Sequence, residues 1–140
     1  MVNIFFEDTD ALDLSPKLFV SWLSDLVSRE TLELGEVSLI FTSDEYLLSV
    51  NQEHLNHDFY TDIITFDYRS GVVVSADLFI SIDMVRYNAD KLSLVFLNEL
   101  YRVVAHGVLH VCGYGDKTPD EKILMTQKEN EALVLIRSYL

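Results

Sequence analysis

The residues with the clearest potential for chemistry are two histidines and an aspartate near the end of an apolar segment. His106 and His110 are four residues apart, and Gly113 and Asp116 follow. Positions i and i+4 of an α-helix lie on one face, so both imidazoles can reach the same ion. Glycine readily adopts the left-handed conformation that ends a helix and turns the chain back. The pattern therefore predicts a metal site whose ligands are His106, His110 and Asp116.

The predicted ligand set indicates what a bound metal would do. Two imidazoles and one carboxylate leave a fourth position open, as in catalytic rather than structural zinc sites. Such an ion lowers the pKa of water toward neutrality and therefore favours hydrolysis. We expect one Zn²⁺ ion, and nickel, iron and manganese also suit these donors. If Asp116 is not a ligand, Asp120 and Glu121 are the next candidates.

The residues around the motif narrow the class of hydrolase. Metallopeptidases with an H-E-x-x-H motif use its glutamate as general base, but the equivalent position here is Gly107. Peptide hydrolysis by that route is therefore excluded. Glu99, seven residues before His106 on the same helical stripe, is a candidate replacement base, although an ion pair with Arg102 is the simpler interpretation. The sequence assigns no catalytic residue besides the predicted ligands.

A long helix and several flanking elements must position this motif. Runs rich in β-branched and aromatic residues predict strands at 2–6, 37–41, 62–68 and 72–80, with a hairpin turn at 69–71 joining the last two. Capping residues followed by apolar residues at helical spacing predict helices at 16–29, 44–54, 81–88, 92–112 and 119–137. Ser93 is the expected cap of the longest helix. We therefore predict an α+β fold, with a small mixed sheet of about four strands covered by about five helices.

Length and composition indicate a single folded domain spanning residues 1–140. The chain has no internal repeat or linker, and its hydrophobic content of 49% excludes disorder despite a net charge of −13. It contains no apolar run long enough to span a membrane and no signal-peptide pattern at its start. The single cysteine, Cys112, cannot form an internal disulfide and is expected to be a small core residue. We expect a cytoplasmic protein without membrane contact.

The segment His-Gly-Val-Leu-His-Val-Cys-Gly-Tyr-Gly-Asp at 106–116 resembles the signature of the YbeY family. These small bacterial proteins are metal-dependent endoribonucleases of ribosomal RNA maturation, with the pattern His-Gly-x-Leu-His-Leu-x-Gly-Tyr-Asp-His. The likeness extends to residues 55–56, 61–66 and 76–80, and to Met125 and Glu129. The third ligand of the family is histidine. Aspartate at 116 is a departure that keeps a metal-binding side chain at the same spacing.

The resemblance implies a single-strand-specific endoribonuclease that acts in ribosomal RNA maturation and ribosome quality control. Its partners would be ribosomal RNA and the ribosome or ribosome-associated proteins, with no nucleotide cofactor. An arginine that engages RNA in the family, shortly after Leu-Asn, has no counterpart in this sequence. His57, Arg69 and Arg86 are candidates to replace it, although ordinary surface roles are the simpler interpretation for each.

Three other functions remain open on the sequence alone. One is a ribosome-assembly or RNA-binding factor with a structural metal, and another is a metallohydrolase of a small substrate or peptide. A non-haem iron oxygenase also uses two histidines and a carboxylate, but it is the least favoured. The acidic charge argues against nucleic acid by itself. If the protein nevertheless acts on RNA, its acidic charge predicts that RNA binding is weak, depends on the metal and is confined to the metal site. Lys117, Lys122 and Arg102 are expected to reduce the acidity around that site.

Overall fold

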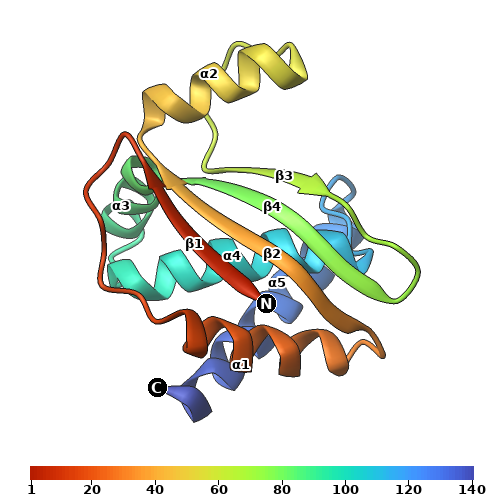
Figure 1. The fold of residues 1–140 in the computed structure, drawn as a ribbon. Coiled ribbons are helices and arrows are strands. Elements are labelled where there is room, and N and C mark those ends of the chain that lie inside the picture. Colours follow the sequence, from red (N-terminus) through yellow and green to blue (C-terminus); the bar gives the residue numbers. More distant parts are fainter.

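The computed structural model describes all residues from 1 to 140 (Figure 1). Its strands are β1 (Val2–Glu7), β2 (Glu33–Thr42), β3 (Ile63–Asp67) and β4 (Val73–Ser81). Its helices are α1 (Pro16–Ser28), α2 (Asp44–Leu55), α3 (Ile82–Lys91), α4 (Phe96–Cys112) and α5 (Pro119–Ile136), and a 3₁₀ turn follows at Arg137–Tyr139. The predicted α+β fold with a mixed four-stranded sheet and five α-helices is confirmed.

The sheet combines parallel and antiparallel pairs in the order β1-β2-β4-β3. Strand β2 lies parallel to both β1 and β4, whereas β3 and β4 form the predicted antiparallel hairpin. In this register Leu39 pairs with Ile4 on one side and with Leu78 on the other. Leu39 and Leu78 are fully buried, so this row of the sheet faces the main core.

The helices cover the two faces of the sheet unequally (Figure 1). Helices α1 and α4 pack on one face, and α5 packs on these helices. The indole Nε1–H of Trp22 donates a buried hydrogen bond of 2.9 Å to the carbonyl of Ala132, which ties α1 to α5. On the other face α2 covers β3 and β4, where Leu47, Val50 and Ile64 form a small second apolar cluster. The main core therefore lies on the side of α1 and α4.

Two glycines explain how α4 fits against the sheet and where it ends. A Cβ atom at Gly107 would lie 2.7 Å from Cδ1 of Ile63 and 3.1 Å from Cδ2 of Leu78. The close approach of α4 to the sheet therefore excludes a side chain at the position where metallopeptidases carry glutamate. Gly113 ends the helix with φ of +114°, a value that side-chain-bearing residues rarely adopt.

Three boundaries differ by three or more residues from the sequence-based expectation: the end of α3, the start of α4 and the start of β2. The helix predicted at 92–112 begins only at Phe96, and Ser93 does not cap it, because α3 continues to Lys91 and the chain turns at 92–95. Ser93 has a positive φ of 55°, and the amide of Leu94 donates to the carbonyl of Ala89. Strand β2 begins four residues early because Glu33 and Leu34 pair with β4. These differences depend on tertiary contacts that local periodicity does not record.

No single helix of this structure is long and apolar enough to cross a membrane. Helices α3 and α4 reach that length and composition only as a pair, and they are bent by 118° relative to each other.

Candidate metal centre

The structure brings the three predicted ligands together at the C-terminal end of α4. Nε2 of His106 lies 3.0 Å from Nε2 of His110, and Oδ2 of Asp116 lies 3.2 Å from each of these nitrogens. The helix places the two imidazoles on one face, and the left-handed residue Gly113 turns the chain so that Asp116 returns to them. The three atoms therefore form a nearly equilateral triangle that can converge on one ion.

Hydrogen bonds at the opposite ring nitrogens orient both histidines. Nδ1–H of His106 donates to a carboxylate oxygen of Glu129 at 2.5 Å, and Nδ1–H of His110 donates to the backbone carbonyl of Tyr114 at 2.8 Å. Ionised carboxylate and carbonyl oxygens only accept hydrogen bonds, so the hydrogen of each neutral ring must lie on Nδ1. Both Nε2 lone pairs are therefore directed into the triangle, as in histidines that bind a metal through Nε2 while Nδ1–H donates to an acceptor.

This donor set fits a small divalent metal ion. Two lone pairs and a carboxylate oxygen about 3 Å apart repel one another unless a cation or a proton lies between them. Tetrahedral zinc with bonds of about 2.0–2.2 Å separates its ligand atoms by about 3.3–3.6 Å, close to the spacing seen here. The side chains of His106, His110 and Asp116 are 20%, 29% and 39% exposed, so a water or substrate oxygen can reach the same point.

A largely buried ionic network contacts His106 at Nδ1, on the side of the ring away from the triangle. We call its members, Glu99, Arg102, His106 and Glu129, the inner cluster. Arg102 donates to both carboxylate oxygens of Glu99, at 2.5 and 2.6 Å, and to Glu129 at 3.2 Å. Glu99 is fully buried and forms an ion pair with Arg102, as the simpler interpretation of the sequence predicted. Arg102 is paired with two glutamates, and it also lines a small hollow with Asp62, His106 and Asp116. Burial raises the pKa of the Asp62 carboxyl group, and the charge of Arg102 opposes that shift, so Arg102 partly offsets the acidity of the site.

The inner cluster favours positive charge at His106. Burial by itself lowers the pKa of His106, but the hydrogen bond and charge of Glu129, together with Asp116, outweigh burial and raise it. Burial raises the pKa of Glu129, but the hydrogen bond from His106 and the charge of Arg102 prevail and lower it. Both shifts mean that an ionised Glu129 carboxylate and a protonated His106 imidazole favour each other.

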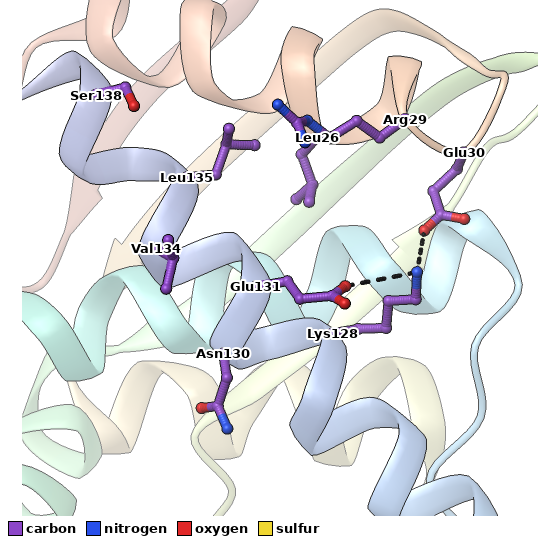
Figure 2. Close-up of a pocket in the computed structure, with 9 residues that line it drawn as sticks. All are labelled: Leu26, Arg29, Glu30, Lys128, Asn130, Glu131, Val134, Leu135 and Ser138. Carbon is purple, nitrogen blue, oxygen red and sulfur yellow. Dashed lines mark ion pairs between the residues drawn. The ribbon is translucent and has the colours of Figure 1, made fainter.

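A second, more exposed group of residues holds the loop after α4, and we call Glu30, Tyr114, Lys128 and Glu131 the outer cluster. The Tyr114 hydroxyl donates to the Glu30 carboxylate at 2.8 Å. Lys128 forms an ion pair with Glu30 at 3.1 Å across an open groove between α1 and α5, and a second pair at 3.6 Å with Glu131, three residues along the same helix (Figure 2). The outer cluster therefore anchors the residue whose backbone carbonyl orients His110.

Other residues considered as ligands lie outside the triangle. Burial raises the pKa of the Cys112 thiol to about 11, and its side chain packs at the edge of the main core. Glu121 forms the capping box of α5 with Thr118, through hydrogen bonds of 3.0 and 3.1 Å. Asp120 is exposed. The group that can hold an ion is therefore His106, His110 and Asp116.

Only one of the three candidates to replace the family arginine lies beside the triangle. Arg69 donates to the carbonyls of Val111 and Cys112 at the end of α4, and the Arg86 guanidinium lies 4.6 Å from the ring centroid of Phe96. His57 lines a cleft that also contains the three candidate ligands. No lysine or arginine lines this cleft.

Sequence reasoning missed two acidic contributions to the site. Asp62 lines the same cleft, and burial raises the pKa of its carboxyl group. Glu129 contacts His106 from 23 residues further along the chain. Both residues occur in segments that resemble the family, but no local spacing connects them with the histidines.

Comparisons with known proteins extend over nearly the whole chain. The profile of the family described as Endoribonuclease YbeY matches residues 5–137. The Endoribonuclease YbeY of Phocaeicola vulgatus is 43% identical over 97% of this chain and 99% of its own length, and that of Bacteroides thetaiotaomicron is 45% identical over 88% and 90%. The solution structure of TM1509 from Thermotoga maritima, 23% identical, has the same fold, with a TM-score of 0.67 over 99% of this chain and 91% of that protein. The chain therefore belongs to the Endoribonuclease YbeY family.

Proposed function

We propose that this protein is a metal-dependent endoribonuclease that cuts single-stranded RNA in ribosomal RNA maturation and ribosome quality control. The whole chain acts as one cytoplasmic catalytic domain, and the ribosome or ribosome-associated proteins deliver the RNA. His106, His110 and Asp116 hold one divalent ion, which we propose to be zinc. Membership of the Endoribonuclease YbeY family supports the activity.

The observation that carries this proposal is the shared orientation of the two imidazoles. Both Nδ1–H groups are used in hydrogen bonds, so both Nε2 lone pairs face Asp116 within about 3 Å. Three donors with an accessible fourth position are typical of catalytic zinc sites. When bound, the ion would polarise a phosphoryl oxygen or lower the pKa of a water molecule.

The residues of the chain have separate tasks around this centre. Glu129 and the Tyr114 carbonyl hold the two imidazoles in their ligating tautomer. The carboxylate of Asp116 reduces the net charge of the centre by one relative to the family's histidine. The partial exposure of the three ligands lets a phosphodiester approach from the cleft.

Removal of one ligand tests the proposal. We expect His110→Ala to lose bound metal in elemental analysis. Its cleavage of a single-stranded RNA should fall by more than the roughly 10–100-fold that follows loss of a residue hydrogen-bonded to a metal ligand. His54→Ala is the matched control, because His54 lies on α2 against Phe66 and does not line the cleft. Full ribonuclease activity in metal-free His110→Ala protein would refute the proposal.

A second pair of variants tests the third ligand. Asp116→Ala should release the metal, whereas Asp120→Ala should retain it, because Asp120 is exposed and outside the triangle. If both variants retain metal as tightly as the unmodified protein, another residue is the third ligand.

One observation favours a second candidate function, a ribosome-assembly factor whose metal is structural. The cleft beside the ligands contains two aspartates and no lysine or arginine, and Arg102 in the adjoining hollow is paired with two glutamates, which weakens direct contact with RNA. This function predicts that chelation lowers the melting temperature while association with RNA or ribosomes persists in the metal-free protein. The endoribonuclease proposal predicts that chelation abolishes cleavage.

A further inference from the structure

The loop between α2 and β3 forms one wall of the cleft that contains the candidate ligands. Residues of this loop and of β3 line the cleft together with His106, His110 and Asp116, around a volume of about 360 Å³. Sites of this size, about 300 Å³ or more, accommodate small organic groups. The loop therefore limits the space beside the candidate ligands.

Two aromatic rings of this loop are stacked and exposed at the cleft. The rings of His57 and Phe59 have centroids 5.1 Å apart and an interplanar angle of 23°. Phe59 is 55% exposed, so much of its ring surface is open to solvent although it stacks on His57. Both residues line the cleft that contains the ligands.

We propose that Phe59, supported by His57, is a stacking platform for an unpaired nucleobase of RNA, next to the phosphate held at the metal centre. This inference rests on the proposed endoribonuclease function and adds to it a binding subsite. A π-face accepts any base that is free of a duplex, so the platform selects single-stranded RNA with little preference for sequence.

The α2 helix holds the platform in place before any ligand binds. The side-chain amide of Asn51, which is buried, donates to the carbonyl of Phe59 at 2.9 Å. The backbone carbonyl of the same asparagine accepts from the amide of His57 at 3.1 Å. Tyr60 donates to Glu45 of α2 at 2.7 Å. Because the loop is already ordered, stacking a base on it requires little additional loss of conformational freedom.

Stacking is the main contact with RNA that the lining of this cleft offers besides the metal. Asp62 and Asp116 line the cleft, and no lysine or arginine does. Arg102 lines the adjoining hollow, where it is paired with Glu99 and Glu129. Arg69 and Arg86 are engaged with the end of α4 and with Phe96. A neutral aromatic surface binds a base without needing a positive charge for the phosphates.

Steady-state cleavage of a short single-stranded RNA by the metal-loaded protein tests the platform. A base stacked on an aromatic side chain contributes enough binding free energy that loss of the ring in Phe59→Ala should raise KM about tenfold to a hundredfold. The kcat value and the metal content should stay unchanged, and Phe59→Trp should retain the original KM. Tyr87→Ala is the control, because Tyr87 is exposed to a similar extent on α3 and does not line the cleft.

A spectroscopic measurement reports stacking directly and does not depend on turnover. RNAs that carry 2-aminopurine at successive positions around the cleavage site should show quenched fluorescence at one position with the unmodified protein. Quenching should be lost with Phe59→Ala and retained with Tyr87→Ala. An abasic ribose at the same position should weaken binding to the unmodified protein but should have little further effect on Phe59→Ala.

The outcomes separate this inference from the proposed function. If the unmodified protein cleaves RNA and a folded Phe59→Ala variant shows the same KM and the same quenching, the platform is refuted and the nuclease proposal stands. If Phe59→Ala does not fold, an abasic RNA bound by the unmodified protein as tightly as the intact RNA refutes the platform. Quenching that depends on Phe59 without any cleavage supports the platform and refutes the nuclease proposal.

Discussion

Two adjacent residues of α5 belong to two charged clusters that differ in how exposed their side chains are. Glu129 belongs to the inner cluster, in which its side chain is 7% exposed and that of Glu99 is 0% exposed. Lys128 belongs to the outer cluster, in which its side chain is 27% exposed and that of Glu131 is 68% exposed. Because successive residues of a helix project in different directions, one turn of α5 contacts both α4 and α1.

Each cluster orients one of the two histidines, but through a different kind of acceptor. The inner cluster presents the Glu129 carboxylate to His106, whereas the outer cluster holds the loop whose Tyr114 carbonyl accepts from His110. A buried carboxylate orients the imidazole and also stabilises positive charge on it, whereas a neutral backbone carbonyl only orients the ring. The inner cluster should therefore control both stability and metal binding, and the outer cluster should have weak effects on both.

The largest difference between the clusters is expected in stability. Arg102→Met leaves the fully buried carboxylate of Glu99 without its ion-pair partner, which should reduce the free energy of unfolding by about 3–5 kcal/mol. Lys128→Met removes a partly exposed cation and should reduce it by about 1 kcal/mol or less. Urea denaturation of both variants measures the contrast. Similar losses in the two variants would contradict it, and adding Glu99→Gln to Arg102→Met should restore part of the loss.

The next difference concerns metal affinity. Glu129→Gln keeps the shape of the side chain but removes the charge beside His106, so affinity should fall about 10–100-fold. Tyr114→Phe removes the hydroxyl contact with Glu30 but leaves the backbone carbonyl that accepts from His110, so its effect should be smaller. Competition with a chelator measures both affinities. A larger loss in Tyr114→Phe would mean that the position of the loop matters more than the charge of Glu129.

The smallest expected effect on stability concerns an exposed hydrogen bond to Asp25 of α1. The Tyr139 hydroxyl donates to Asp25 at 2.7 Å, and this bond together with Arg29 lowers the pKa of the Asp25 carboxyl group. A lowered folded-state pKa stabilises the protein above the unfolded-state value, near pH 4, and this stability is lost as pH falls through the folded-state value. Asp25→Asn should therefore cost less than about 1 kcal/mol at pH 7. Unfolding measured between pH 7 and pH 3 should show the difference shrinking with acidity.

Local sequence signals predicted the elements around the site well where short-range contacts control them. The caps of α1 and α2, Ser15 and Ser43, accept hydrogen bonds from amides three residues later, and Pro119 begins α5. The break between α3 and α4 could not be predicted in the same way. The apolar residues at 92–97 continue a helical pattern, but the packing of both helices requires a turn there.

The sequence by itself determined the triangle of candidate ligands. Four-residue spacing on a helix and a glycine with a positive φ are local features, and they suffice to bring His106, His110 and Asp116 together. Only the tertiary structure decided what surrounds them. Glu129 reaches His106 from another helix, and Phe59 reaches the cleft from the loop before β3. Such contacts depend on how the helices and the sheet pack, because residues that are distant along the chain leave no periodic signal in the sequence.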